Sequence, residues 1–91
     1  MRKIRFSRQA ENFLRKAPSK HAKQIIERIQ DLSKDPNSGQ NAELKGFAPM
    51  RRLKSGEYRV IYEMKDDAVD VIIIGKRNDD EVYQLLKRFL G

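Results

Sequence analysis

Residues 50–76 carry the alternating hydrophobic pattern of β-strands. Three segments of this kind cover about residues 50–54, 57–65 and 69–76, and turns at Ser55-Gly56 and Asp66-Asp67 separate them. Joins this short predict an antiparallel meander, because parallel strands need a much longer crossover. The segment 69–76 starts with a run that is apolar at nearly every position, so we expect it to be central in the sheet and covered on both faces.

The first half of the chain combines one short strand with two helices. Residues 3–6 alternate polar and apolar side chains, after which Ser7 is placed to cap a helix that runs through Lys16. Pro18-Ser19 starts a second helix, and Asp35-Pro36 stops it. We expect the two helices to form an αα-hairpin and the short strand to pair elsewhere in the sheet. Their apolar stripes are Ala10, Phe13, Leu14 and Ala17, followed by Ala22, Ile25, Ile26, Ile29 and Leu32.

A final amphipathic helix follows the meander. Asn78 and Glu81 have the spacing of a capping box, and the acids at 79–81 favour the positive end of a helix. Tyr83 lies at the edge of the apolar stripe, next to the end of the strand that carries Arg77. The polar segment 37–41 contains turn-forming residues and is predicted to be a connector. The buried stripe of the last helix consists of Val82, Leu85, Leu86 and Phe89.

Together these patterns predict one α+β domain over residues 1–91, with the element order β-α-α-β-β-β-α. Its sheet is antiparallel-rich and packs against the αα-hairpin, and the C-terminal helix lies beside a cleft. Ninety-one residues are enough for one modest core and too few for a second domain.

The charge of the chain is high and unevenly distributed. The formal net charge is +7; residues 1–54 contain 14 of the 20 Lys and Arg and 5 of the 13 acids. A basic field of this kind favours an anionic partner. A lysine-rich surface that is simply solvated is the alternative reading. The polar faces of the first two helices carry a cationic stripe, defined as Arg15, Lys16, Lys20, Lys23 and Arg28.

The composition of the chain argues against several kinds of structural and metal site. The chain has no cysteine and one histidine, which argues against a disulfide scaffold, a zinc ribbon and the common metal clusters. We therefore expect no cofactor and no metal, and we assign His21 to the surface without a role. No segment approaches the roughly 20 apolar residues of a membrane span, and the first residues lack the apolar run of a signal peptide. A cytoplasmic location without membrane contact is the expectation.

The candidate chemistry is carried by arginines and a tyrosine. Arginine is suited to grip a phosphate at two points, and a tyrosine can stack on a base or move a proton. Arg59 follows a tight turn, and Arg77 ends the apolar strand shortly before Tyr83. The alternative for Arg59 is an ion pair with Glu57 or Glu63, and for Arg77 an ion pair with Asp79 or Asp80. Strand alternation places Arg59 on one face with Ile61 and Glu63. The other face carries Tyr58, Val60, Tyr62 and Met64, and we expect its two tyrosines to lie in the core.

Three stretches resemble the RelE toxin family of bacterial and archaeal toxin-antitoxin modules, within the RelE/ParE superfamily. They are Leu44-Lys45-Gly46, the run from Ser55 to Tyr62, and Gly75-Lys76-Arg77 followed by Glu81-Val82-Tyr83. The first two stretches mark the superfamily, and the third marks its RNA-cleaving branch. The resemblance covers nearly the whole chain.

We predict a catalytic set of Arg52, Lys54, Arg59, Arg77 and Tyr83, of which the resemblance implies Arg59, Arg77 and Tyr83. Arg59 and Arg77 take the places of cations that bind the phosphate and leaving group, and Tyr83 that of the aromatic that orients the substrate. The family pattern has two lysines on the preceding strand, where this chain has Arg52 and Met50. Because an arginine stays protonated, it is a poor general base, and this task falls to Lys54 or Tyr83.

The implied function is a ribosome-dependent mRNA endoribonuclease that cleaves in the ribosomal A site by attack of a 2′-hydroxyl and so inhibits translation. A site without an evident base would depend on the ribosome to hold the substrate, and the cationic stripe could then dock on ribosomal RNA. The resemblance also implies a cognate antitoxin with an acidic amphipathic segment, in a hetero-oligomeric complex. Two alternatives remain open: a ParE-like inhibitor of DNA gyrase without enzymatic activity, and a degenerate member that keeps antitoxin binding and has lost cleavage.

Overall fold

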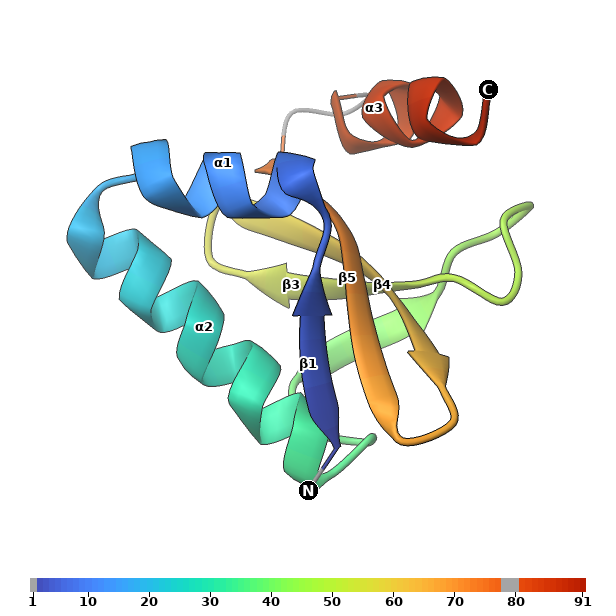
Figure 1. The fold of residues 1–91 in the computed structure, drawn as a ribbon, viewed down its shortest axis with the longest axis horizontal. Helices are drawn as coiled ribbons and strands as arrows, with labels where there is room; N and C mark the ends of the chain where they lie inside the picture. The colour runs from blue at the N-terminus through green and yellow to red at the C-terminus, as the bar shows by residue number, and fades with distance from the viewer. Residues whose placement is uncertain (1, 78–80) are drawn as a thin grey trace.

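The computed structural model describes residues 2–77 and 81–91, and these form a single five-stranded sheet with three helices (Figure 1). The strand order is β1-β5-β4-β3-β2. The α+β class and the αα-hairpin agree with the predictions. The elements are β1 (Lys3–Phe6), α1 (Arg8–Lys16), α2 (Ser19–Lys34), β2 (Gln40–Glu43), β3 (Arg51–Ser55), β4 (Tyr58–Lys65), β5 (Ala68–Lys76) and α3 (Glu81–Leu90).

The predicted meander is confirmed in β3, β4 and β5, which pair antiparallel in sequence order. β1 pairs parallel with the first half of β5, so β5 is an internal strand, as expected. The prediction for residues 37–41 is wrong in one respect, because residues 40–43 form β2 on the outer edge of β3. Its sequence Gln-Asn-Ala-Glu has no apolar alternation, since three of its four side chains are exposed on an edge strand.

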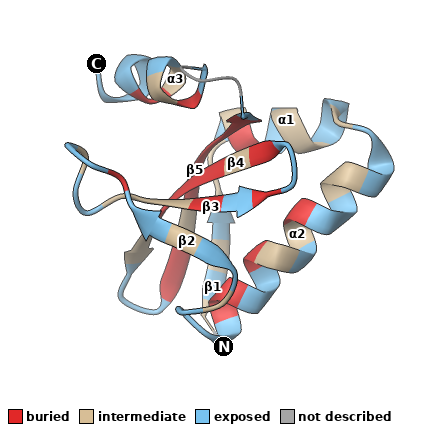
Figure 2. Ribbon diagram, turned by 180° about the vertical axis from the view of Figure 1, so that it is seen from behind, coloured by how far each residue is buried: buried red, intermediate tan, exposed pale blue. Residues whose placement is uncertain are grey.

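The sheet separates two hydrophobic cores. On one face α1 and α2 cover a core that includes Leu53, Val60 and Tyr62, each of them fully buried. On the other face α3 and the segment before β3 cover a core that includes Ile61 and Ile73. Figure 2 shows the buried positions on β4, on β5 and on the sides of the helices that face the sheet. The sheet therefore has a separate core on each of its faces.

Two helix ends follow the sequence predictions. Ser7 caps α1, because its Oγ accepts a hydrogen bond from the amide of Ala10 at 3.1 Å. α2 ends at Lys34, with Asp35 as its C-cap. Asn78, the proposed cap of α3, lies outside the described residues. Glu81 reaches back to β5 instead, where its Oε2 accepts from the backbone amide of Lys76 at 3.0 Å.

The second half of β5 has no neighbouring strand on the β1 side, and side chains take the place of one. The Oγ of Ser7 donates to the carbonyl of Ile72. The side-chain amide of Gln9 both donates to the carbonyl of Ile74 at 2.8 Å and accepts from its amide at 2.9 Å. Glu81 completes the series at Lys76. These bonds satisfy the strand edge and fix the start of α1 and of α3 to the same strand.

In the described part of the chain, none of the helices has the length and apolar character needed to cross a membrane.

Candidate active site

The five predicted site residues come from β3, from β4, from the end of β5 and from α3. Leu53 points into the core beneath α1 and α2, so its neighbours Arg52 and Lys54 lie on the opposite face of β3. In the pairing of β3 with β4, Arg52 is opposite Ile61 and Lys54 is opposite Arg59. The grouping of Arg52 and Lys54 on one face, apart from Leu53, agrees with the sequence pattern.

Arg59 is held by backbone oxygens and not by an acid. Its Nη1 donates to the carbonyl of Gly56 at 3.0 Å and to that of Tyr58 at 2.9 Å. Within residues 2–77 and 81–91, no carboxylate lies at ion-pair distance from it, so the alternative pairing with Glu57 or Glu63 is wrong for this structure. The guanidinium therefore keeps its charge available for an anion.

Tyr83 contacts the site from α3. Its hydroxyl accepts a hydrogen bond from Nη1 of Arg52 at 3.3 Å. The ring lies 6.3 Å from that of Phe47, with the planes tilted by 44°. The buried Nε of Arg52 has no partner in the described residues. Tyr83 thus stands half-buried between a cation and an aromatic ring, which orients the phenol toward the arginine.

Arg77 is located where β5 ends. Its backbone amide donates to the carbonyl of Glu57 at 2.7 Å, which extends the β4–β5 pairing by one step, and its side chain is exposed. Two residues earlier Gly75 is opposite Arg59. The register therefore brings the backbones of Arg59 and Arg77 to the same end of the sheet. Asp79 and Asp80, the suggested partners of Arg77, lie outside the described residues.

Gly75 allows α3 to approach this end of the sheet. A Cβ built on Gly75 would lie 2.8 Å from Cγ1 of Val82, a distance that packed side chains do not tolerate. Val82 is buried in the core beneath α3. The glycine in the sequence Gly75-Lys76-Arg77 is therefore required so that α3 can place Tyr83 beside β3.

Two contacts were not identified from the sequence, one in this region and one on the opposite face of the sheet. Phe47, in the segment before β3, packs against Tyr83, and the only nearby signal was the motif Leu44-Lys45-Gly46 that precedes it. His21 is not the freely solvated residue that was expected. It is half-buried, and its Nδ1 lies 2.7 Å from the hydroxyl of Tyr58 on the opposite face of the sheet. A helical residue and a strand residue 37 positions apart leave no local pattern of this contact.

Met50 occupies the position where the family has its farther lysine. It packs against the core beneath α3 and is half-buried, so it contributes apolar contact and no charge. Lys54 is exposed and stands opposite Arg59 on the neighbouring strand. Of the two groups considered as the base, Lys54 is thus open to solvent, while Tyr83 is bonded to Arg52.

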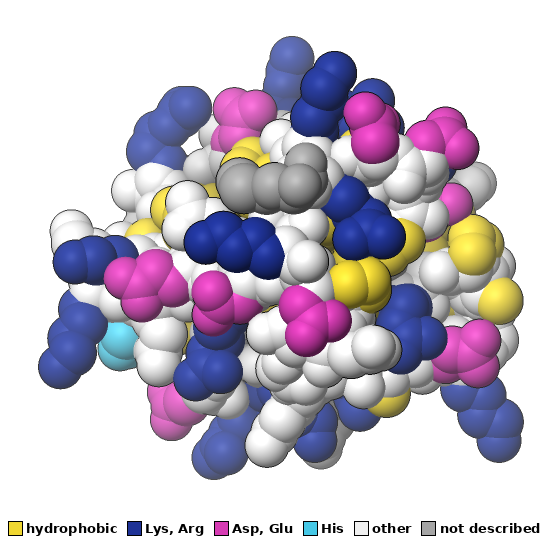
Figure 3. All heavy atoms as spheres, turned by 90° about the horizontal axis from the view of Figure 1, so that it is seen from below, with side chains coloured by type: hydrophobic (Ala, Val, Ile, Leu, Met, Phe, Trp, Pro, Cys, Tyr) yellow, Lys and Arg dark blue, Asp and Glu magenta, His cyan; other side chains and the backbone are white. Residues whose placement is uncertain are grey.

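The basic side chains are spread over the surface. In the face shown in Figure 3, Lys and Arg side chains surround the outline and acidic side chains lie between them, so this face presents no continuous cationic patch. In the cationic stripe, the four residues Arg15, Lys16, Lys20 and Lys23 are exposed and Arg28 is half-buried. Within the described ranges, no group of three or more His, Asp or Glu side chains is arranged to hold a metal ion.

A sheet between an αα-hairpin and a C-terminal helix, with arginines and a tyrosine at one end, defines a small toxin of the RelE/ParE type. The model of the ParE toxin of type II toxin-antitoxin systems (parDE) matches residues 4–81. The chain therefore belongs to this family, in the RelE/ParE superfamily, and is a toxin of a type II toxin-antitoxin system.

Solved structures agree with this assignment. The isolated E. coli RelE toxin matches with a TM-score of 0.73 and 25% identity over 100% of both chains. The toxin-antitoxin complex RelBE2 from Mycobacterium tuberculosis matches with a TM-score of 0.69 and 25% identity, over 84% of this chain and 98% of that one. The chromosomal ParDE system from P. aeruginosa shares the fold, with a TM-score of 0.68 and 17% identity over 84% and 96% of the two chains. A search of curated proteins found no match.

Proposed function

We propose that the protein is a ribosome-dependent endoribonuclease that cleaves mRNA in the ribosomal A site. The proposal is carried by the arginines at this end of the sheet. Arg52 donates a hydrogen bond to Tyr83, and among the described residues no carboxylate lies within ion-pair distance of Arg59. Arginines beside a phenol suit the binding and cleavage of a phosphodiester, whereas an inhibitor that only occupies a protein target needs no such cluster.

In the proposed reaction the 2′-hydroxyl of one ribose attacks the adjacent phosphorus atom. The bond from phosphorus to the 5′-oxygen breaks, and a 2′,3′-cyclic phosphate and a free 5′-hydroxyl result. The uncharged amine of Lys54 or the phenolate of Tyr83 accepts the proton of the 2′-hydroxyl, and the leaving 5′-oxygen takes a proton from water. Arg52, Arg59 and Arg77 stabilise the charge on the non-bridging oxygens, for which one well-placed donor contributes roughly 10² to 10³ in rate.

The ribosome enters the proposal because lysine and tyrosine side chains are in general protonated near neutral pH, which makes them weak bases there. Positioning of the attacking hydroxyl in line with the leaving oxygen would then supply most of the rate. The exposed members of the cationic stripe would bind ribosomal RNA in a salt-sensitive way. A purified protein without ribosomes should cleave RNA poorly.

A cognate antitoxin is the second partner that we propose. The structure of RelBE2 from M. tuberculosis that this chain matches is a toxin-antitoxin complex. The net charge of +7 on this chain favours an antitoxin with an acidic segment that covers the basic surface. We propose that both proteins act in the cytoplasm.

An assay for the two functional classes separates this proposal from gyrase inhibition. Purified protein is added to a translation reaction and, in parallel, to a DNA gyrase supercoiling reaction. The proposal predicts that translation stops and supercoiling continues. Inhibition of supercoiling with unaffected translation would assign the protein to the inhibitor class, and inhibition of neither would identify a degenerate member.

A further inference from the structure

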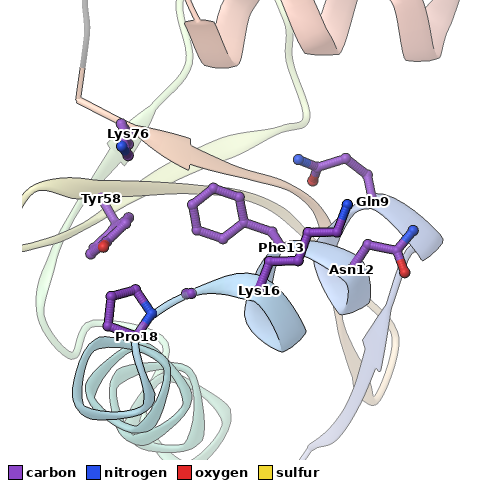
Figure 4. Close-up of a pocket in the computed structure, with 8 residues that line it drawn as sticks. Gln9, Asn12, Phe13, Lys16, Pro18, Tyr58 and Lys76 are labelled. Carbon is purple, nitrogen blue, oxygen red and sulfur yellow. The ribbon is translucent and has the colours of Figure 1, made fainter.

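A hollow lies on the face of the sheet opposite Arg52 and Tyr83. It has a volume of about 520 Å³ and opens where α1, the turn into α2 and the ends of β4 and β5 meet (Figure 4). Pockets of this size hold small ligands or parts of larger ones. No residue of the candidate active site lines it, and the catalytic scheme above does not use it.

The floor of the hollow is a fixed pair of aromatic rings. Tyr58 is 7% exposed, and its hydroxyl is hydrogen-bonded to His21 at 2.7 Å. Phe13 meets Tyr58 edge to face, with ring centroids 5.7 Å apart and planes at 80°. Figure 4 shows the ring of Phe13 in the middle of the hollow, between Tyr58 and Lys16. Phe13 is half-buried, so part of its ring is open to a planar group that enters the hollow.

The rim provides positive charge and an amide. Lys16 and Lys76 stand on two sides of the hollow, both exposed, and none of the described residues that line it is an acid. Asn12 is exposed at the mouth and offers a donor and an acceptor. Gln9 also lines the hollow, but both ends of its amide are bonded to Ile74, so it acts as a fixed wall. The open groups therefore suit a phosphate and the edge of a base.

The position of the hollow connects it with the candidate active site. Lys76 immediately precedes Arg77, and strand alternation turns their side chains to opposite faces of β5. A nucleic acid strand that passes over this end of β5 would meet Arg77 on one face and Lys76 on the other. An acidic protein segment would find the same charges, but the continuity with a phosphate-binding site favours a nucleic acid.

We propose that this hollow binds one unpaired nucleotide of the RNA, whose base stacks on Phe13 and whose phosphate lies between Lys16 and Lys76. Adjacent nucleotides of the same strand reach Arg77. The inference rests on the proposed RNA substrate, and it adds a second contact that fixes the strand relative to the site of cleavage.

Binding of a labelled, uncleavable 2′-O-methyl RNA oligonucleotide, followed by fluorescence anisotropy, tests the inference. Phe13→Leu keeps an apolar side chain over the core and removes the stacking surface, so affinity should fall about tenfold or more, as for the loss of one stacked base. Lys76→Gln should weaken binding and reduce the dependence of affinity on salt by about one phosphate contact. The matched control is Lys65→Gln, which changes an exposed lysine at the other end of β4. It removes the same charge away from the hollow, so we expect only the small loss of affinity that any lost positive charge causes.

Asn12→Ala and Lys76→Gln alter exposed residues, so they report on the hollow even if Phe13→Leu lowers stability. Unchanged affinity in all three variants would overturn the inference, and so would Phe13-dependent binding of an acidic peptide but not of RNA. Parallel cleavage assays with ribosomes keep the two proposals apart. Cleavage with no Phe13-dependent RNA binding would refute only this inference, whereas Phe13-dependent binding without cleavage would refute only the proposed enzymatic function.

Discussion

At the scale of single residues, the site is a set of cations held by backbone and phenol oxygens. Arg59 is fixed by the carbonyls of Gly56 and Tyr58, and Arg52 by the hydroxyl of Tyr83. Bonds to neutral oxygens orient a guanidinium without cancelling its charge. A carboxylate in the same place would compete with a phosphate for the arginine. The arrangement is therefore suited to an anionic substrate that arrives from solution.

Loss of a cation or of the phenol should reduce cleavage without unfolding the protein. For Arg77→Ala we expect a fall of roughly 10² to 10³ in the rate of ribosome-dependent cleavage, since its exposed side chain leaves the core unchanged. Tyr83→Phe keeps the ring on Phe47 and removes the oxygen that Arg52 binds, with a similar loss expected. Arg88→Ala, an exposed change on the same helix as Tyr83, is the control. Growth arrest that survives both site variants would contradict the nuclease account.

The contact between Arg52 and Tyr83 predicts that their effects are coupled. Arg52→Ala removes the donor, and Tyr83→Phe removes the acceptor, of the same 3.3 Å bond. The double variant should therefore cleave faster than the product of the two single effects predicts, with a coupling of about 0.5–3 kcal/mol. Cleavage rates of the four proteins, measured on one programmed ribosome, give this number. Additive effects would mean that the two side chains act separately.

At the scale of elements, Gly75 sets how closely α3 packs on the sheet. Gly75→Ala places a methyl group 2.8 Å from Val82, so α3 must move away or the core beneath it must rearrange. We expect a loss of about 1–3 kcal/mol in the free energy of unfolding, measured by urea denaturation. Val82→Ala in the Gly75→Ala background removes the clashing methyl group and should cost less than it does in the wild type. An unchanged cost would show that α3 does not depend on this contact.

The elements were predictable to the extent that their pattern is local. The apolar pattern of β4 and β5 and the apolar stripes of α1 and α2 were enough to predict these elements. Ser7 was correctly predicted to cap α1. β2 was not predicted because its side chains are polar and its partner strand is not adjacent in sequence, as in the pairing of Ala42 with Arg52 ten residues later. The family spacing indicated Arg59, Arg77 and Tyr83, but no pattern indicated the contact of Tyr83 with Phe47 or of His21 with Tyr58. Such contacts arise only when the sheet, the hairpin and α3 are assembled.

At the scale of the whole molecule, the two proposed sites lie on opposite faces of one sheet. α3 and the segment that contains Phe47 shape the arginine and tyrosine site on one face. On the other face the hairpin covers the larger core and leaves the hollow around Phe13 at its end. β5 belongs to both, since its terminal residues turn Lys76 to one face and Arg77 to the other. This strand end links the two surfaces on which our proposals rest.

The buried hydroxyl of Tyr62 should make the stability of the whole fold depend on pH in the alkaline range. Burial raises the pKa of Tyr62 above its usual value near 10, and the charge of the nearby Arg51 opposes part of this rise. As the pH rises past about 10, the unfolded chain releases this proton before the folded one does, so stability is lost. Tyr62→Phe should lose less stability than the wild type between about pH 9 and 11.

Urea denaturation at several pH values compares the two proteins. At neutral pH we expect Tyr62→Phe to be as stable as the wild type or more stable by up to about 1 kcal/mol, because the hydroxyl is buried without a hydrogen-bond partner of good geometry in the described residues. Equal slopes of the unfolding free energy against pH would show that Tyr62 is ionised as easily in the folded chain as in the unfolded one.

The central claim is tested most directly by primer extension on a defined mRNA incubated with the purified protein, with and without programmed ribosomes that have an empty A site. We predict new 3′ ends within the A-site codon only when ribosomes are present, and none with Arg77→Ala. Intact mRNA under both conditions would contradict the account and leave gyrase inhibition or loss of catalysis. Equal cleavage of free mRNA would refute the dependence on the ribosome.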